Sequence, residues 1–112
     1  MLGIEMEEEM LAKINEMLSA GARNFEEKNY QMAFLNYLNA LLSIGSYLIY
    51  RDLGLLYPPE GALGMMRVRY PNIYEIVLKY QGYQLSIASV GEDVAREIRE
   101  DTLRIYEREI KG

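Results

Sequence analysis

The sequence predicts an all-α protein, an up-and-down bundle of four main helices in a single domain over residues 1–112. Apolar residues recur every three or four positions along most of the chain, which is typical of amphipathic helices. Half of the residues are apolar, and 112 residues give room for one globular domain. The only alternating stretch, 66–70, is five residues long and has no partner strand. The main helices are expected at about 5–27, 30–53, 71–87 and 90–110, with a short extra helix near 59–67.

The first helix, expected over residues 5–27, carries one apolar stripe and several glutamates in its first turns, which suit the helix dipole. The stripe consists of Met10, Ile14, Met17 or Leu18, Gly21 and Phe25. Asn29 can cap the next helix, so the connection between the two helices is short. A short connection makes them antiparallel neighbours.

The second helix, expected over residues 30–53, contains a 22-residue uncharged run at positions 29–50, in a chain of which 26% is charged. A membrane-spanning helix needs a similar length, about 20 residues. The six asparagine, glutamine and serine side chains of the run would need partners inside lipid. We therefore expect a helix buried at the centre of the bundle, and no membrane contact.

One face of this second helix is polar but uncharged. Its polar side chains step by three and four positions and therefore form a narrow ridge: Asn36, Asn39, Ser43, Ser46 and Tyr50. Ala40, Ser43, Gly45 and Ser46 are small, so that another backbone can approach closely there. Neutral polar groups in an apolar setting are costly unless they are paired. The ridge is therefore a candidate interface.

Prolines and glycines divide the second half of the chain. Pro58 and Pro59 end the second helix, and Pro59 can start the short extra helix. Pro71 marks a second break, after which helical spacing continues to the end. This stretch is either one helix or two. Ser89 and Glu92 match a capping box, which favours two helices over 71–87 and 90–110.

The absence of histidine and cysteine limits the chemistry of the chain. It removes the commonest general base, the commonest zinc ligand, thiolate metal sites and disulfides. Among carboxylates, Glu97 and Asp101 have a metal-ligand spacing, but an exposed pair balanced by Arg104 is the favoured interpretation. No glycine-rich phosphate loop is present. We expect no catalytic residue, no metal and no cofactor.

Ten tyrosines are the remaining unusual feature, and many lie in the middle of the chain. The favoured interpretation is a core in which the tyrosine hydroxyls reach the surface. Tyr74, Tyr80 and Tyr83 also join the ridge as candidate interface residues, since protein interfaces are enriched in tyrosine. Basic residues lie among them, and aromatic and basic side chains together can bind nucleic acid. That alternative would use Arg67, Arg69 and Lys79. The net charge of −5 argues against nucleic acid as a partner, because phosphate binding needs a basic surface.

The hairpin over residues 10–56 resembles known families. The spacing of Gly21, Ala33, Tyr37 and Ala40 is similar to tetratricopeptide-type hairpins, and MIT-like and HEPN-like bundles use a comparable hairpin. HEPN ribonucleases also need a histidine that this chain lacks. The strongest resemblance is to an archaeal family catalogued as domain of unknown function 357. The residues that carry this resemblance are Phe25 to Tyr30, Ala33, Phe34, Ala40, Gly45 and Gly54 to Leu56. Ser43 stands where that family has an aspartate. The resemblance implies an archaeal source and a helical bundle, and no activity.

The function expected from the sequence is that of a non-enzymatic module for protein–protein interaction or self-association. The expected partner is a second copy, as a homodimer or higher oligomer, or another protein. The two alternatives are the nucleic-acid-associated protein described above and a carboxylate-based metal-dependent enzyme. The acidic N-terminal residues do not resemble a secretory signal, so a cytoplasmic location is expected. The composition, rich in isoleucine, tyrosine, glutamate and arginine, is typical of thermophiles.

Overall fold

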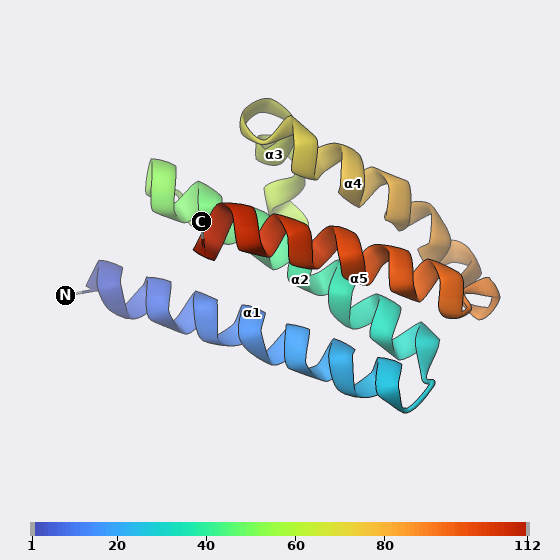
Figure 1. Ribbon diagram of the computed structural model, residues 1–112. Coiled ribbons are helices and arrows are strands. Elements are labelled where there is room, and N and C mark those ends of the chain that lie inside the picture. Colours follow the sequence, from blue (N-terminus) through green and yellow to red (C-terminus); the bar gives the residue numbers. More distant parts are fainter. Residues whose placement is uncertain (1, 112) are drawn as a thin grey trace.

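The computed structural model of the chain describes residues 2–111 (Figure 1). The predicted domain also includes Met1 and Gly112, which lie outside the described residues. Five α-helices are present: α1 (Leu2–Glu26), α2 (Tyr30–Leu53), α3 (Leu63–Arg69), α4 (Pro71–Gln81) and α5 (Glu92–Tyr106). Residues 2–111 contain no strand, so the predicted all-α class is confirmed. The helices number one more than the four predicted main helices, because the expected short helix near 59–67 forms α3. Figure 1 shows that α1, α2, α4 and α5 run in alternating directions.

Helix α2 is the centre of the bundle, as its uncharged sequence predicts. Each of the other four α-helices packs against it. Every residue from Ala40 to Ile49 is buried, which leaves no continuous solvent-facing side over that stretch. The helix is long and apolar enough to cross a bilayer, but 72% of its most apolar window is buried inside the bundle. Most of its apolar surface is thus covered by the rest of the chain.

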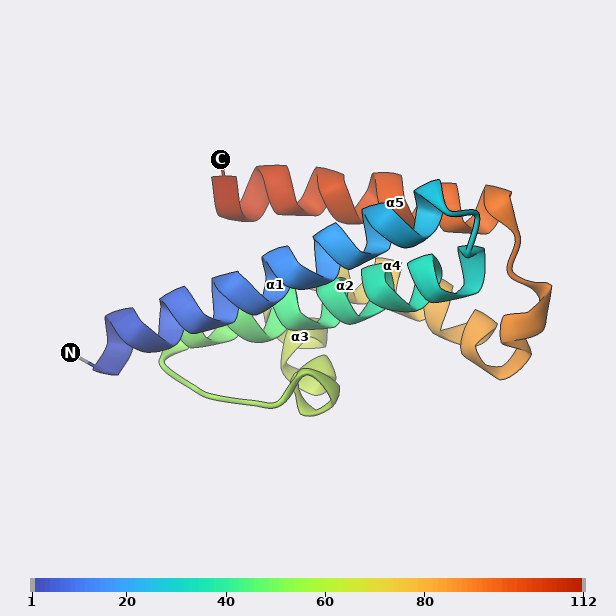
Figure 2. The same ribbon diagram turned by 90° about the horizontal axis from the view of Figure 1, so that it is seen from below.

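Helices α1 and α2 form the predicted antiparallel hairpin (Figure 2). The chain reverses through Lys28, whose φ of 63° is left-handed, and Asn29 precedes the first turn of α2. The predicted cap position is confirmed, but the Asn29 side chain makes no capping hydrogen bond with the described residues. Gly21 allows the close approach of the helices, because a β-carbon there would lie 2.8 Å from the ring of Tyr37.

The segment after α2 turns back along the bundle. Gly54 ends α2 with a left-handed φ of 70°, and its N–H donates to the Tyr50 carbonyl. An irregular stretch then leads to a short 3₁₀ helix, η1 (Pro59–Ala62), which continues into α3. Figure 2 shows this stretch as a wide loop beside α1 and α2.

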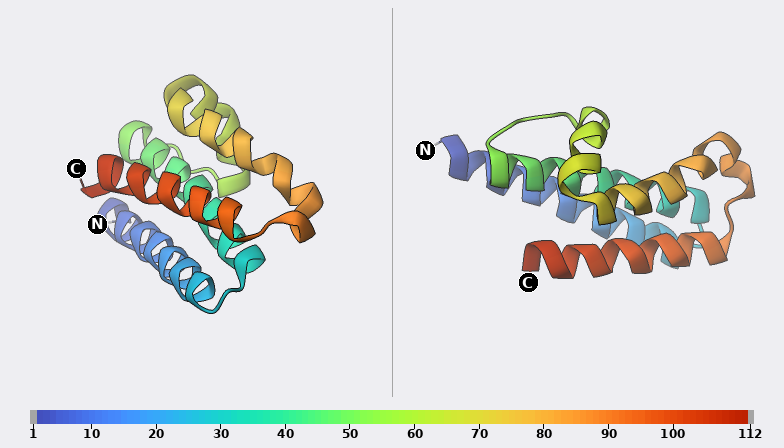
Figure 3. Two further views of the ribbon diagram at one scale, coloured as in Figure 1. Left: turned by 45° about the vertical axis from the view of Figure 1, so that its right-hand side comes forward. Right: turned by 90° about the horizontal axis from the view of Figure 1, so that it is seen from above.

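The region 71–110 contains two helices, as favoured, but their boundaries differ from the predicted ones. Helix α4 ends at Gln81 and not near Ile87, because Gly82 is a poor helix former and a 3₁₀ segment, η2 (Gly82–Ser89), follows. This segment is broken at Ser86, where φ is −133°. Figure 3 shows η2 carrying the chain from α4 to α5 at one end of the bundle.

The predicted capping box before the last helix is wrong. Gly91 occupies the cap position of α5, and the Ser89 hydroxyl donates instead to the Ser86 carbonyl at 2.7 Å. Glu92 pairs with Arg96 on the outer face. Helix α5 continues into a final π-helical turn, η3 (Glu107–Lys111).

Candidate interaction groove

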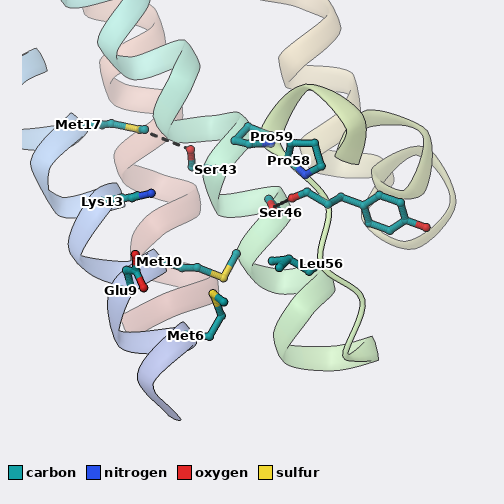
Figure 4. A pocket seen from close by; sticks show the side chains of 11 residues that line it. Met6, Glu9, Met10, Lys13, Met17, Ser43, Ser46, Leu56, Pro58 and Pro59 are labelled. Carbon is teal, nitrogen blue, oxygen red and sulfur yellow. Dashed lines mark hydrogen bonds between the residues drawn. The ribbon is translucent and has the colours of Figure 1, made fainter. Parts of the chain in front are cut away.

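An open apolar hollow of about 560 Å³ lies between α1, α2 and the loop that follows α2 (Figure 4). We call it the methionine groove. Three methionines of α1, two serines of α2, and leucine, tyrosine and two prolines of the loop and η1 line it, with one glutamate and one lysine of α1. The lining residues are Met6, Glu9, Met10, Lys13, Met17, Ser43, Ser46, Leu56, Tyr57, Pro58 and Pro59.

The α1 wall is a stripe with helical spacing. Met6, Met10, Lys13 and Met17 succeed one another at intervals of four, three and four positions, so their side chains leave the same face. The three methionines are half-buried. Figure 4 shows them reaching from α1 towards α2 and the loop, with the Lys13 side chain between them. Unbranched thioether side chains adapt to differently shaped apolar partners.

Two residues of the predicted polar ridge form the floor of the groove. The Ser43 hydroxyl donates to the sulfur of Met17 at 3.5 Å, and the Ser46 hydroxyl donates to the Tyr57 carbonyl at 2.5 Å. The Ser46 bond ties the loop to α2. Both serines are buried, with exposed fractions of 9% and 2%. Their hydroxyl protons are therefore engaged by a thioether and a carbonyl, neither of which is a general base.

The other residues of the ridge lie outside the groove. The Asn36 carboxamide oxygen accepts a hydrogen bond from Asn24 of α1 at 2.7 Å, which joins the two helices of the hairpin. Asn39 is exposed, and Tyr50 is half-buried. The ridge thus faces α1 and the loop over part of its length and solvent over the rest.

The loop wall presents apolar surface to solvent. Leu56 is 58% exposed and Leu55 is 42% exposed. Pro58 and Pro59 stiffen this wall, since proline fixes its own φ and restricts the preceding residue. Neither this wall nor Met6 was predicted from the sequence, whereas Met10 and Met17 belong to the predicted apolar stripe of the first helix. The spacing of the methionines is a sequence signal, but the groove also needs the returning loop.

The charges beside the groove are unevenly distributed. Helix α1 carries six glutamates against Lys13 and Arg23, a net charge of −4, while the whole chain carries −5. All eight ion pairs among the described residues lie between positions 51 and 111. The glutamates of α1 are thus left without an ion-pair partner within the described part of the chain.

Tyr80, one of the candidate interface tyrosines, joins α4 to α5. It is fully buried, and its hydroxyl donates to Asp101 at 2.5 Å and lies 3.1 Å from Glu97. Burial raises the pKa of Tyr80, and the two carboxylates raise it further. The ammonium of Lys79, which is 2.8 Å away, lowers the pKa of Glu97.

Glu97 and Asp101, the carboxylate pair with a metal-ligand spacing, are the two carboxylates that Tyr80 contacts. Burial raises the pKa of Asp101, but the hydrogen bonds from Tyr80 and Arg104 outweigh it, so the net shift is downward. Arg104 lies 2.8 Å from Asp101, so the expected balance by Arg104 is present. The expected exposure of the pair is wrong for Asp101, whose side chain is only 14% exposed and accepts a hydrogen bond from Tyr80. Among residues 2–111 no three potential ligands of the histidine, cysteine or carboxylate type gather as a metal site would need.

The remaining candidate residues lie around α3, α4 and η2. Tyr83 packs edge-on against Phe34 at 6.0 Å between ring centres, and Tyr74 is half-buried. Arg67 and Arg69 of α3 are exposed. The third member of the nucleic-acid alternative, Lys79, is paired with Glu97.

A second polar cluster, not anticipated from the sequence, fastens the end of α2 to the start of α4. The Tyr70 hydroxyl donates to Asp52 at 2.6 Å and lies 3.0 Å from the Leu48 carbonyl. Burial, followed by the bond to Asp52, raises the pKa of Tyr70 to about 12. Hydrogen bonds from Arg51 and Tyr70 lower the pKa of Asp52.

In comparisons with known proteins, no protein-family model, curated protein or solved structure matches this chain.

Proposed function

We propose that this chain is a non-enzymatic interaction module that binds an apolar protein segment in the methionine groove. The observation that carries the proposal is the groove itself, an open hollow of about 560 Å³ with three methionines on one wall and Leu56 on the other. Its exposed apolar lining suits contact with an apolar partner.

The chemistry inside the groove supports binding over catalysis. A serine nucleophile needs a base to take its proton. Ser43 donates its proton to a sulfur atom, and Ser46 donates to a backbone carbonyl. The groove therefore offers shape and apolar contact, and no activated nucleophile.

The experiment is methyl NMR on protein with labelled methionine methyl groups. Met6, Met10 and Met17 report on the groove, and the fully buried Met66 is an internal control. The protein is titrated with amphipathic helical peptides of both charge signs, and it is also concentrated alone. Selective shifts of the groove methyls support the proposal. If those methyls respond neither to any peptide nor to concentration, the proposal is wrong.

A matched pair of variants locates the binding surface. Leu56→Glu places a charge in the groove wall and should abolish the methyl shifts. Leu85→Glu places the same charge on a residue of η2 that is 97% exposed and outside the groove, so the shifts should remain. Equal effects of the two variants would argue against the groove as the binding surface.

The alternative function, nucleic-acid binding through Arg67, Arg69 and Lys79, has less support because Glu97 neutralises Lys79. Its test is oligonucleotide binding at low salt, where phosphate contacts are strongest. The archaeal source, the thermophilic character, the cytoplasmic location and the likeness to domain of unknown function 357 are proposals that rest on the sequence alone.

A further inference from the structure

We infer that the occupant of the methionine groove is a cationic amphipathic helix of a partner protein, about three turns long. The inference rests on the proposed function and adds the chemical class of the partner. Three observations carry it: the length of the groove, its volume, and the charge of the helix that forms one wall.

The length of the groove fits a short helix. Met6 and Met17 mark its ends along α1, and eleven residues of α-helix span about 16 Å. Three turns of a partner helix cover the same distance. An amphipathic helix presents apolar side chains on one face at three- and four-residue spacing, which is how such helices bind in grooves.

The volume of the groove fits side chains and not a whole helix. An α-helix with its side chains is about 10 Å wide, so three turns occupy far more than the 560 Å³ available. A row of two or three large apolar side chains suits the space. The body of the partner helix would then lie above the groove, between α1 and the exposed Leu56.

The charge of α1 selects the sign of the partner. The charged residues that line the groove, Glu9 and Lys13, cancel each other, but α1 as a whole has a net charge of −4. Glu5 precedes Glu9 by one helical turn on the same side, and both are exposed. No residue of the described chain forms an ion pair with either. Lysines or arginines on the polar face of a partner helix would compensate these charges. A second copy that offered its own α1 would instead bring another net charge of −4.

Lys13 provides an internal test of the same argument. It is the one cation among the residues that line the groove. A cationic partner is repelled by Lys13 and attracted by Glu5 and Glu9. Neutralising the lysine and neutralising the glutamates must therefore change the affinity in opposite directions, whereas purely apolar binding predicts no change from either.

The experiment uses two peptides of about four helical turns with the same leucine face. One carries lysines on its polar face and the other carries glutamates at the same positions. The chain has no tryptophan, so a single tryptophan in each peptide reports binding by fluorescence. We expect the basic peptide to bind at least about tenfold more tightly than the acidic one, with an affinity that falls as salt rises.

The variants test the groove charges directly. Glu5→Gln with Glu9→Gln should weaken binding of the basic peptide about fivefold, as expected for two exposed ion pairs. Lys13→Gln should strengthen it by a factor of about two. Glu100→Gln removes an exposed glutamate of α5 outside the groove and should leave the affinity unchanged.

The outcomes separate this inference from the proposed function. If the acidic peptide binds as well as the basic one, the charge argument is wrong and the interaction module stands. If neither peptide binds and the groove methyls do not move with concentration, both are wrong. If the groove methyls move with protein concentration alone, the occupant is a second copy, and the inference of a cationic partner is overturned.

Discussion

The sulfur atom of Met66 lies in the space that a side chain at Gly45 would need. A β-carbon built on Gly45 would be 2.0 Å from the Met66 sulfur and 2.9 Å from its γ-carbon. Gly45 lies in α2 and Met66 in α3, and both are buried. The hydrogen atom at position 45 therefore sets how closely the α3 segment packs on the central helix.

Gly45→Ala should destabilise the protein. Overpacking costs about 1–3 kcal/mol, and the gain in helix propensity returns up to about 1 kcal/mol, so we expect a net loss of about 1–2 kcal/mol. Urea denaturation measures it. Gly64→Ala is the control, because a β-carbon at that helical position meets no atom within 4 Å and should stabilise. Equal stability of the two variants would contradict the packing argument.

The carboxylates that join α4 to α5 should make stability depend on pH in acid. The pKa values of Glu97 and Asp101 are lowered in the folded protein, so the unfolded chain binds protons first as the pH falls. The stabilisation is complete above the ordinary carboxyl pKa of about 4 and is lost as the pH falls through the folded values. Asp101→Asn should lower stability at neutral pH and flatten this decline. An unchanged slope in urea denaturation at a series of acidic pH values would refute the role of Asp101.

Tyr70 should make stability depend on pH in alkali. Its folded pKa of about 12 lies above the ordinary value of 10.0, so the unfolded chain ionises first as the pH rises. The stabilisation is complete below pH 10 and is lost between about pH 10 and 12. Tyr70→Phe should remove part of this loss. Titration followed by tyrosinate absorbance, compared between the native protein and Tyr70→Phe, isolates the ionisation of Tyr70, and ionisation at the ordinary pKa of 10.0 would speak against the bond to Asp52.

Ser46→Ala should loosen the loop wall of the groove. It removes the hydrogen bond to the carbonyl of the half-buried Tyr57, at a cost of about 0.5–1.5 kcal/mol. Hydrogen exchange of the Gly54 and Gly61 amides, which flank the loop and donate to the Tyr50 and Pro58 carbonyls, should speed up. Ser43→Ala is the control, because its bond is to a thioether, a weak acceptor, and the loop amides should exchange at the native rate. Equally slow exchange in both variants would show that other contacts hold the loop.

The fold was predictable where local pattern and long-range packing agree. The uncharged run of residues 29–50 indicated a buried central helix, and Asn29 and Pro71 marked helix boundaries that the structure retains. The end of the third main helix was not predictable from spacing, because Ile87 keeps the helical period although the backbone has already left the α-helix at Gly82. The capping box failed because Ser89 found a nearer acceptor in η2.

The candidate site was predictable only in part. The spacing of Ser43 and Ser46 singled out both floor residues of the groove. Their partners, Met17 and the Tyr57 carbonyl, come from α1 and from a loop whose path depends on Gly54 and on the docking of η1. The loop wall of the groove forms only when the loop packs against α2, and residue spacing within the sequence does not reveal this long-range contact. The small residue at position 45 predicted a close approach, but the approaching group is a methionine side chain and not a backbone.

The unequal distribution of charge makes the side of the molecule that carries α1 more negative than the rest. Almost all of its net charge is on α1, and the rest of the chain carries −1. A cationic molecule that diffuses nearby is therefore drawn towards one side before any contact forms, and this attraction extends about 10 Å at moderate salt. The paired charges of residues 51–111 exert little such pull. For the proposed cationic partner, the helix that shapes the groove would also set the side of approach. Raising the salt concentration should then slow association more than it speeds dissociation.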